Sequence, residues 1–345
     1  MAVLTRTTHD RGSLAGMAQC DPELESRLRQ GMAATEDRLR ACVAQARHPF
    51  TAALADRVVM SGGKRLRPLM VLLGAEFGEP GRAGVVDAAM LVELVHAASL
   101  CHDDVMDQAG TRRGAPSINA VHGNRTAVLA GNWLLAKGGA IAAGLERESL
   151  LLHTRVTERL VEGQLRELAG PAPDAFHEDA LAHYFAVISG KSASLISVSL
   201  RIGAVQAAAP DALVRALGTY GEHLGLAFQI SDDLLDVTSD SSVSGKEQGK
   251  DLAAGVPSLP VLLALADQRP KARKLRELLT SGRPATARQH RRLLSLLRSS
   301  DAMTDARAMM HDRLGLARAA LADLPAGPAR SVLDEICDFV ARRDR

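Results

Sequence analysis

The sequence predicts an all-α protein, built as a single domain of antiparallel helices. Apolar residues recur at intervals of three and four along nearly the whole chain, and alternating runs rich in Val, Ile or Thr are missing. Hydrophobic residues make up 46% of the 345 residues, whereas aromatic residues make up only 3%. A core of this composition must be filled by Leu, Ala, Val and Ile, which suits packed helices, and the chain is long enough to build a sizeable one.

Short segments rich in glycine, proline and polar residues separate the expected helices. These breaks fall at residues 79–81, 170–173, 208–211, 239–249, 280–287 and 325–328. We expect residues 1–20 to be a flexible leader and residues 21–345 to be the folded domain. The polar segment 239–249 carries Lys246 and is the most loop-like of the internal breaks, which makes it a candidate for a mobile lid.

The composition and the N-terminal sequence argue against a nucleic-acid partner, secretion and a membrane span. The net charge is +2, so no overall field attracts nucleic acid, and no nucleic-acid partner is expected. The leader has no apolar segment typical of a secretory signal, and the four cysteines are scattered without a Cys-x-x-Cys pair, so a cytoplasmic location is expected. Residues 127–145 come closest to a membrane span, but Asn132, Lys137 and four glycines favour a buried central helix, so no transmembrane segment is predicted.

Two nearly identical acidic motifs are the most informative feature of the chain. Residues 103–107 are Asp-Asp-Val-Met-Asp and residues 232–236 are Asp-Asp-Leu-Leu-Asp, and each motif follows a mostly apolar run. Carboxylates at i and i+4 share one helix face, and at a buried helix end they repel one another unless a cation compensates them. A set of oxygen ligands favours Mg²⁺, which takes a few carboxylates and completes its shell with water and phosphate. A solvated acidic face could explain one such motif, but the pair predicts Mg²⁺ sites for a phosphorylated ligand. The predicted metal ligands are Asp103, Asp104, Asp107, Asp232, Asp233 and Asp236.

Basic residues beside glycines supply partners for such a ligand. Lys64 and Arg67 are three residues apart in a Gly-rich segment that leads into a helix, so they can converge on one anion. Lysine and arginine bind phosphate through charge-assisted hydrogen bonds. Each basic residue alone could be a solvated side chain, but their recurrence beside glycines and beside the acidic motifs indicates diphosphate binding. The candidates are Lys64, Arg67, Arg112, Arg113, Lys191 and Lys246.

With these motifs the chain resembles the trans-isoprenyl diphosphate synthases, also called polyprenyl synthetases. The matching stretches occur in the family's order and are GGKRLRP (62–68), VELVHAASLCHDDVMD (92–107), TRRG (111–114), AVLAGNWLLA (127–136), GKSASL (190–195), LGLAFQISDDLLDV (224–237) and GKEQGKDLAAGVPSLP (245–260). The resemblance implies the isoprenoid synthase type of fold, in which antiparallel helices surround a central cavity and the two acidic motifs face each other at its mouth. It also implies a homodimer, because the family commonly forms one.

The resemblance further implies roles for single residues. The metal ligands would be Asp103 and Asp107 with Asp104 in support, and Asp232 with Asp233 and Asp236 close by, for three Mg²⁺ ions in all. Contacts to the allylic diphosphate are implied for Arg112, Lys191 and Lys246, with Ser192 in place of the family's usual Thr. The isopentenyl diphosphate pocket would consist of Lys64, Arg67, His96 and Arg113, and Gln229 would lie near the forming cation.

The implied reaction is the condensation of isopentenyl diphosphate with an allylic diphosphate. Mg²⁺ and basic side chains stabilise the departing pyrophosphate, and the double bond of isopentenyl diphosphate attacks the allylic cation. A proton is then lost and the product is five carbons longer. No Ser, Cys or His nucleophile is required. The departing pyrophosphate can accept the proton, which explains the absence of an obvious protein base.

Three positions depart from the family's pattern, and none of them is a metal ligand. Asn132 stands where the family often has Asp, and Gln108 stands where an acid is common after the first motif. Val256 replaces a second lysine near the lid, which removes one cation near the diphosphate.

Small residues before the first motif bear on product length. Short-chain synthases tend to place an aromatic residue at one of two positions that Ala98 and Ser99 occupy here, and Gly139 stands where long-chain members often carry a bulky stop. We therefore expect a deep tunnel and a product of geranylgeranyl length or longer. The alternative is that these small residues only let helices pack closely.

Three other functions compete with chain elongation. A class I terpene cyclase typically keeps one aspartate-rich motif and lacks the GGKRLRP site, whereas this chain has both motifs and that site. A non-catalytic subunit of a heteromeric synthase usually has one degraded motif, and neither motif is degraded here. An unrelated helical scaffold would need none of these residues, so the sequence favours the elongating enzyme.

Overall fold

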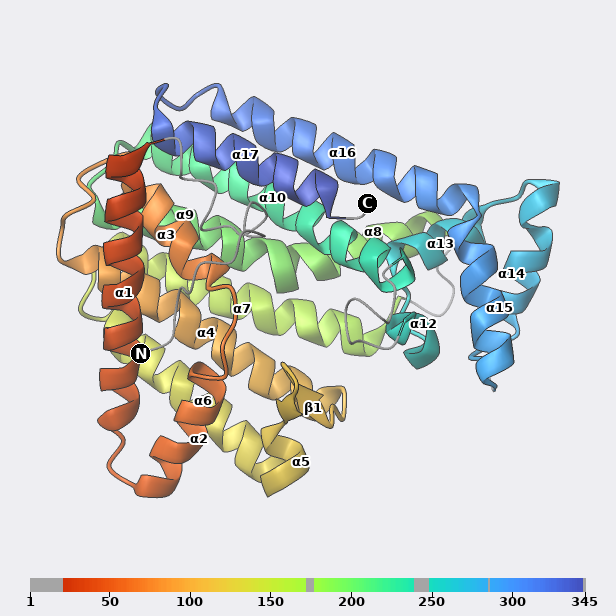
Figure 1. Ribbon diagram of the computed structural model, residues 1–345, viewed down its shortest axis with the longest axis horizontal. Helices are drawn as coiled ribbons and strands as arrows, with labels where there is room; N and C mark the ends of the chain where they lie inside the picture. The colour runs from red at the N-terminus through yellow and green to blue at the C-terminus, as the bar shows by residue number, and fades with distance from the viewer. Residues whose placement is uncertain (1–20, 172–176, 239–247, 285, 344–345) are drawn as a thin grey trace. The chain divides into compact units, whose positions relative to one another are not determined.

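The computed structural model describes residues 21–171, 177–238, 248–284 and 286–343, and most of these residues are helical. The prediction of an all-α fold is therefore confirmed, and β-structure within the described residues is confined to one short antiparallel hairpin. The elements (Figure 1) are α1 (Pro22–Ala44), α2 (Pro49–Val59), α3 (Leu66–Ala75), α4 (Gly84–Met106), β1 (Thr111–Arg112), β2 (Ala115–Pro116), α5 (Ile118–His122), α6 (Asn124–Ala142), α7 (Arg147–Ala169), α8 (His177–Ile188), the π-helix η2 (Ser189–Ala193), α9 (Ser194–Gln206), α10 (Asp211–Thr238), α12 (Lys250–Ala254), α13 (Leu259–Ala266), the 3-10 helix η3 (Pro270–Ala272), α14 (Arg273–Thr280), α15 (Ala287–Arg298), α16 (Asp301–Leu321) and α17 (Pro328–Arg342).

The chain divides into two compact units. Unit 1 comprises the described residues up to Glu158 together with Leu195–Thr219 and Ala320–Ile336. Unit 2 comprises the described residues of Arg159–Ser194, Tyr220–Ala319 and Cys337–Arg345. The first acidic motif belongs to unit 1 and the second to unit 2, and the expectation of one domain over residues 21–345 stays a prediction.

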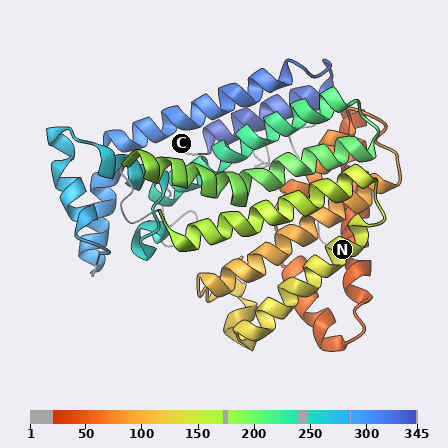
Figure 2. The same cartoon turned by 180° about the vertical axis from the view of Figure 1, so that it is seen from behind.

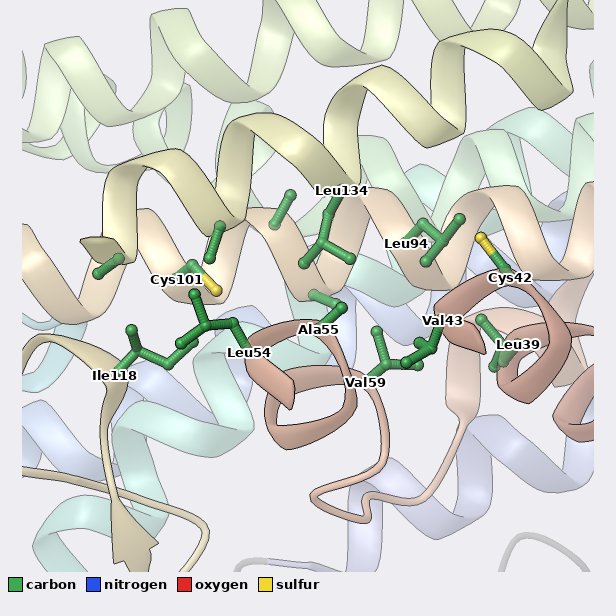
Figure 3. Packing of buried hydrophobic residues seen from close by; sticks show 14 of the residues in the cluster. Leu39, Cys42, Val43, Leu54, Ala55, Val59, Leu94, Cys101, Ile118 and Leu134 are labelled. Atoms are coloured by element: carbon green, nitrogen blue, oxygen red, sulfur yellow. The ribbon is translucent and has the colours of Figure 1, made fainter. Parts of the chain in front are cut away.

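Unit 1 is built around α4, an apolar helix that is buried along most of its length. It lies beside α6, as the orange and yellow helices of Figure 2 show, and it also packs against α3 and α1 and contacts α2 and α5. Figure 3 shows the resulting core, where Leu54 of α2, Leu94 and Cys101 of α4 and Leu134 of α6 come together. Because burying a leucine side chain contributes about 1.5–3 kcal/mol, this cluster fixes α4 and the acidic motif at its carboxyl end.

Glycines let α3 and α9 approach each other backbone to backbone within unit 1. A Cβ added at Gly203 of α9 would overlap the carbonyl oxygen of Val71 in α3. A Cβ added at Gly74 of α3 would likewise overlap the carbonyl oxygen of Leu200 in α9. Each helix thus presents a glycine to the backbone of the other, so neither position has room for a side chain.

Unit 2 carries the second acidic motif on the part of α10 that begins at Tyr220. In this unit α13 packs against α8, α14 and α15. A Cβ added at Gly225 of α10 would overlap Ala193 of η2, and one added at Gly190 of η2 would lie 2.8 Å from the carbonyl oxygen of Arg159 in α7. The π-helix is therefore held closely between α7 and α10.

Two described stretches, Gly84–Met106 and Ala180–Gln206, are long and apolar enough to cross a membrane. In each stretch 67% of the apolar window is buried inside the protein, as in the core helix of a water-soluble protein, so they are weak evidence for a membrane span. Neither of these two stretches is residues 127–145, which from the sequence alone came closest to a membrane span. That region forms most of α6, which packs against α4.

The glycine contact between α3 and α9 predicts a large effect of one methyl group. Gly203→Ala should lower the free energy of unfolding by about 1–3 kcal/mol or more, because the added methyl overpacks a rigid backbone contact. Gly315→Ala in α16 is the control, since the added Cβ meets no described atom within 4 Å and alanine favours a helix. Denaturant unfolding followed by circular dichroism measures both, and equal stabilities of the two variants would contradict the prediction.

Candidate active site

A cluster of basic residues, called the basic pocket below, forms in unit 1 where the chain turns from α2 into α3. Gly62 and Gly63 have φ angles of +88° and +130°, a conformation that side chains rarely tolerate, and they make the turn that precedes α3. Lys64 follows on the exposed side of this turn. Arg113, from the hairpin after α4, donates a hydrogen bond to the carbonyl oxygen of Gly62. A Cβ at Gly63 would lie 2.8 Å from the Arg113 guanidinium, so only glycine leaves room for that side chain.

His96 joins this pocket from α4 as a neutral imidazole. Its Nε2 lies 3.2 Å from Nη1 of Arg67, and because arginine can only donate, Nε2 is the acceptor. Burial lowers the pKa of His96 well below its usual value, and the positive charges of Arg67, Arg113 and Arg112 lower it further. The structure thus brings together Arg67 with His96, and Arg113 with the glycine turn that carries Lys64, whereas a shared role of these four residues in binding stays a prediction.

The first acidic motif divides its carboxylates between two tasks. Asp104 is 6% exposed and accepts a 2.8 Å hydrogen bond from Nε of Arg112. Its carbonyl oxygen accepts a 2.9 Å hydrogen bond from the side chain of Asn119, which ties the following loop to the end of α4. Asp103 is half-buried and Asp107 is exposed at the end of α4, one turn further on. Asp104 therefore holds Arg112, and Asp103 and Asp107 share the neighbouring face of the helix.

The second motif divides its carboxylates in a similar way within unit 2. Asp233 is 4% exposed and accepts hydrogen bonds from the Tyr184 hydroxyl at 2.8 Å, the Leu259 backbone N–H at 2.9 Å and the Gln229 amide at 3.1 Å. Burial raises the pKa of Asp233 to about 6, although these hydrogen bonds oppose the rise. Asp233 thus links α10 to α8 and to the start of α13.

The other two carboxylates of the second motif have different partners. Asp236 accepts hydrogen bonds from the backbone N–H groups of Lys250 and Asp251 at 3.0 and 3.1 Å, at the start of α12. Burial raises the pKa of Asp236, and these hydrogen bonds oppose the rise. Asp232 is half-buried, and its carboxylate accepts a 2.7 Å hydrogen bond from Nη2 of Arg343. A cationic side chain of unit 2 therefore already lies against this carboxylate.

The π-helix η2 positions Lys191, Ser192 and, through a hydrogen bond, Gln229. The Ser192 hydroxyl donates to the Gln229 side-chain oxygen at 2.7 Å, and the Gln229 amide donates in turn to Asp233. Lys191 forms an ion pair with Glu167 of α7. Widened π turns of this kind often mark functional sites, and here the turn connects three predicted site residues with the second acidic motif.

The donor set fits Mg²⁺ bound partly by substrate. Within the described residues no three side chains of His, Cys, Asp or Glu lie together as a complete metal cage. Mg²⁺ does not require one, because it is usually bound through one or two carboxylates and completes its octahedron with waters and phosphate oxygens. Asp103 and Asp107, which share one face at the end of α4, are two such carboxylates within unit 1, and Asp232 is one within unit 2.

Several other predicted residues have a defined place. Ala98 is fully buried in the cluster of Figure 3, whereas Ser99 is only half-buried and lies on the same face of α4 as Asp103. A Cβ added at Gly139 of α6 would meet no described atom within 4 Å. Lys246 lies outside the described residues. Val256, at one of the departures from the family's pattern, is 40% exposed.

Sequence reasoning missed the partners that hold these residues in place. Glu167, Tyr184 and Arg343 contact predicted site residues, but they lie 24, 49 and 111 residues from those residues along the chain. None belongs to a recognised motif. Pairing across such distances has no local signal, so a single sequence could not indicate it.

Comparisons with known proteins identify the family to which the chain belongs. The model of the family described as "Polyprenyl synthetase" matches residues 48–297. A nonaprenyl diphosphate synthase of Mycobacterium tuberculosis is 38% identical over 330 residues, which cover 95% of this chain and 92% of that protein. A heptaprenyl diphosphate synthase component 2 of Geobacillus stearothermophilus is 34% identical over 321 residues, which cover 92% of this chain and 97% of that protein.

Solved structures share the fold as well. A geranylgeranyl pyrophosphate synthase from Corynebacterium glutamicum, complexed with calcium and isoprenyl diphosphate, has a TM-score of 0.83 at 34% identity, over 94% of this chain and 98% of that one. A decaprenyl diphosphate synthase from Rhodobacter capsulatus has a TM-score of 0.83 at 31% identity, over 94% and 99%. The isoprenoid synthase type of fold predicted from the sequence is confirmed.

The neutral state of His96 predicts how stability depends on pH. Folding favours the uncharged imidazole, so its contribution is complete above the unfolded-state pKa of about 6.5 and is lost as the pH falls below it. One such histidine contributes up to about 1.4 kcal/mol per pH unit, so His96→Gln should reduce the acid slope of stability by up to that amount. Urea unfolding between about pH 7.5 and 5.5 measures the slope, with the exposed His311→Gln as control. An unchanged slope in His96→Gln would contradict the neutral assignment.

Proposed function

The chain belongs to the polyprenyl synthetase family, and from this premise we propose that it condenses isopentenyl diphosphate with an allylic diphosphate to give an all-trans polyprenyl diphosphate. The observation that carries the proposal is the contact of Arg67 with His96, and of Arg113 with the glycine turn before Lys64, which places basic residues together in unit 1 in addition to its acidic motif. One diphosphate needs the metals, and a second needs a pocket of cations and neutral donors. A cyclase handles one diphosphate and has no use for such a pocket.

The metal is Mg²⁺ in this proposal, with Asp103, Asp107 and Asp232 as its ligands. Asp233 and Asp236 support them from within unit 2, and three ions are proposed in total. When bound, the ions neutralise charge that develops on pyrophosphate as it leaves. The relatives solved with calcium and isoprenyl diphosphate support divalent-metal binding in the family.

The side chains of this chain then perform three tasks. In unit 1, Arg112, oriented by Asp104, is proposed as a donor to the leaving pyrophosphate. The same role is proposed for Lys191 in unit 2 and for Lys246, which lies outside the described residues. For Lys191 to do so, the diphosphate must compete with its ion pair to Glu167. Gln229 is fixed by Ser192 and Asp233, so its amide presents a constant dipole near the allylic cation.

The basic pocket binds the second substrate and keeps its double bond in reach of the cation. Lys64, Arg67 and Arg113 supply positive charge, and neutral His96 supplies an Nδ1–H donor because its Nε2 accepts from Arg67. The C–O bond of the allylic diphosphate breaks and a C–C bond to isopentenyl diphosphate forms. The proton lost from the product passes to the released pyrophosphate.

We propose a homodimer in the cytoplasm as the working form. Unit 1 exposes several large apolar side chains on α5, α6 and the first part of α7, and a symmetric partner would cover them. They are Val121, Val128, Leu129, Leu150 and Leu151. A relative named as component 2 of a heptaprenyl synthase makes a heteromeric enzyme the second candidate. Turnover by the purified chain alone favours the homodimer.

The metal assignment predicts the outcome of two substitutions. Asp103→Ala and Asp232→Ala should each lower turnover of labelled isopentenyl diphosphate by about a hundredfold or more while the fold stays intact, because each removes a ligand that supports developing pyrophosphate charge. Asp87→Ala, on the same helix as Asp103, is the control and should stay within about twofold. Chelation of the metal should abolish activity and added Mg²⁺ should restore it. Near-normal turnover in either variant of the motifs would refute the mechanism.

The length of the product gives a second test of the proposed function. The structure indicates which residue to replace. Ser99 lies one turn before Asp103 on the same face of α4, so Ser99→Phe should place a ring in the path of the growing chain and shorten the products. Ala98→Phe should mainly destabilise unit 1, because Ala98 is packed in its core and overpacking costs about 1–3 kcal/mol. Chromatography of the dephosphorylated products, with thermal unfolding in parallel, separates the two effects. Products of wild-type length from a folded Ser99→Phe enzyme would refute this path.

A further inference from the structure

Arg65 stands between two predicted substrate residues, yet it faces the interior. It follows Lys64 in the turn before α3, and its backbone has φ 49° and ψ 40°, the left-handed conformation. A residue with a side chain pays roughly 1–2 kcal/mol for this conformation, so surrounding contacts must hold it. Arg65 is only 9% exposed, whereas Lys64 beside it is exposed.

The Arg65 guanidinium joins three helices of unit 1 to the start of a fourth. It donates from Nε to Glu36 of α1 at 2.6 Å, from Nη1 to Glu93 of α4 at 2.6 Å and from Nη2 to the carbonyl oxygen of Val59 in α2 at 2.7 Å. The three acceptors lie around the planar guanidinium group, whose N–H donors point in fixed directions that match their positions. The first residue of α3 follows directly, so the position of α3 depends on this contact.

The charges around Arg65 exclude it as a diphosphate ligand. Its guanidinium is bound by two carboxylates, of which Glu93 is 2% exposed. Within the described residues, the second oxygen of Glu93 is buried without a hydrogen-bond partner, so the carboxylate is held in the core at a cost. Buried ion pairs of this kind are weak evidence for stability, because apolar replacements are often neutral or stabilising. A role in placing neighbouring groups accounts for them better.

Glu93 and the substrate pocket share one face of α4. His96 lies one turn after Glu93, and His96 in turn contacts Arg67 at 3.2 Å. The same helix face therefore holds Arg65 through Glu93 and meets Arg67 through His96. Lys64 and Arg67, on either side of Arg65, take their positions from this anchor.

We propose that Arg65 is a positioning residue for isopentenyl diphosphate: its buried contacts with Glu36, Glu93 and Val59 hold the Lys64–Arg67 turn in the geometry that binds the diphosphate group. This inference rests on the proposed function for the identity of the substrate. It assigns to Arg65 no contact with the substrate, and it predicts a defect specific to one of the two substrates.

The test compares Arg65→Lys with a matched control. Lysine keeps the charge but lacks the planar fork, so the turn should loosen. The KM for isopentenyl diphosphate should rise about tenfold or more, whereas the KM for the allylic substrate and its hydrolysis without isopentenyl diphosphate should stay within about twofold. Arg38→Met is the control, because Arg38 forms an exposed ion pair with Asp87 that also joins α1 to α4 but does not touch the turn. It should leave both KM values unchanged.

A double-mutant cycle separates positioning from general stability. If Arg65 acts through Lys64 and Arg67, adding Arg65→Lys to a Lys64→Ala/Arg67→Ala enzyme should raise the KM for isopentenyl diphosphate no further. If Arg65 has only a structural role, Arg65→Lys should raise the KM for isopentenyl diphosphate in the Lys64→Ala/Arg67→Ala enzyme as much as it does in wild type. It should also raise the KM values for both substrates together. Either result would overturn the proposal. If Arg65→Lys does not fold, Glu93→Gln, which keeps the shape of the acceptor, carries the same test with the same expected split.

Calorimetry makes the inference independent of turnover. Isopentenyl diphosphate titrated into wild type, Arg65→Lys and Arg38→Met should bind about tenfold more weakly to Arg65→Lys alone. If wild type binds it but no condensation occurs with any allylic primer, the proposed function fails while the positioning role is still supported by that difference. Equal affinity in the folded Arg65→Lys protein overturns the positioning role and leaves the proposed function standing. If wild type itself does not bind it, both fail.

Discussion

The site depends on how the protein compensates carboxylates that lie at the ends of apolar helices. A buried carboxylate without a partner is costly, and two neighbouring carboxylates raise that cost. Each acidic motif meets the problem by directing one aspartate inward: Asp104 binds Arg112 and Asp233 binds Tyr184, Gln229 and the start of α13. The inward aspartates fix the helix ends and their neighbours. The other carboxylates of each motif are less buried, and those of the second motif have partners of their own, Arg343 for Asp232 and the start of α12 for Asp236.

Helix α4 aligns several of the polar residues of unit 1 along one face. Along it lie Glu93, His96, Ser99, Asp103 and Asp107, spaced by three or four residues, so they occupy one side of the helix. The opposite side packs into the core through leucine, alanine and cysteine. Small residues there let neighbouring helices approach closely, and close packing leaves little freedom for α4 to shift. Precise positions of polar groups thus follow from the packing of apolar ones.

The sequence predicted what depends on local pattern and failed where long-range pairing decides. The helical periodicity and the acidic motifs are local, and both the all-α fold and the family were predicted from them. Arg65 shows the limit: nothing in GGKRLRP indicates that this side chain is buried between Glu36 and Glu93, which lie 29 and 28 residues away along the chain. Ala98 shows another, since the sequence did not indicate that this small residue is fully buried in the core cluster of unit 1, and its place beside a tunnel stays a prediction. Both outcomes depend on which helices are neighbours, which one sequence does not reveal.

The basic pocket presents the opposite problem, because its cationic side chains repel one another when no anion is bound. Arg65, Arg67, Arg112 and Arg113 all lower the pKa of His96, which shows how strongly their charges act on one buried group. The carboxylates of Glu36, Glu93 and Asp104 offset two of these charges, those of Arg65 and Arg112. A protonated histidine would add a further charge, and burial prevents it. The pocket can therefore stay folded before the substrate arrives, and the positive charge that remains is concentrated where a diphosphate would bind.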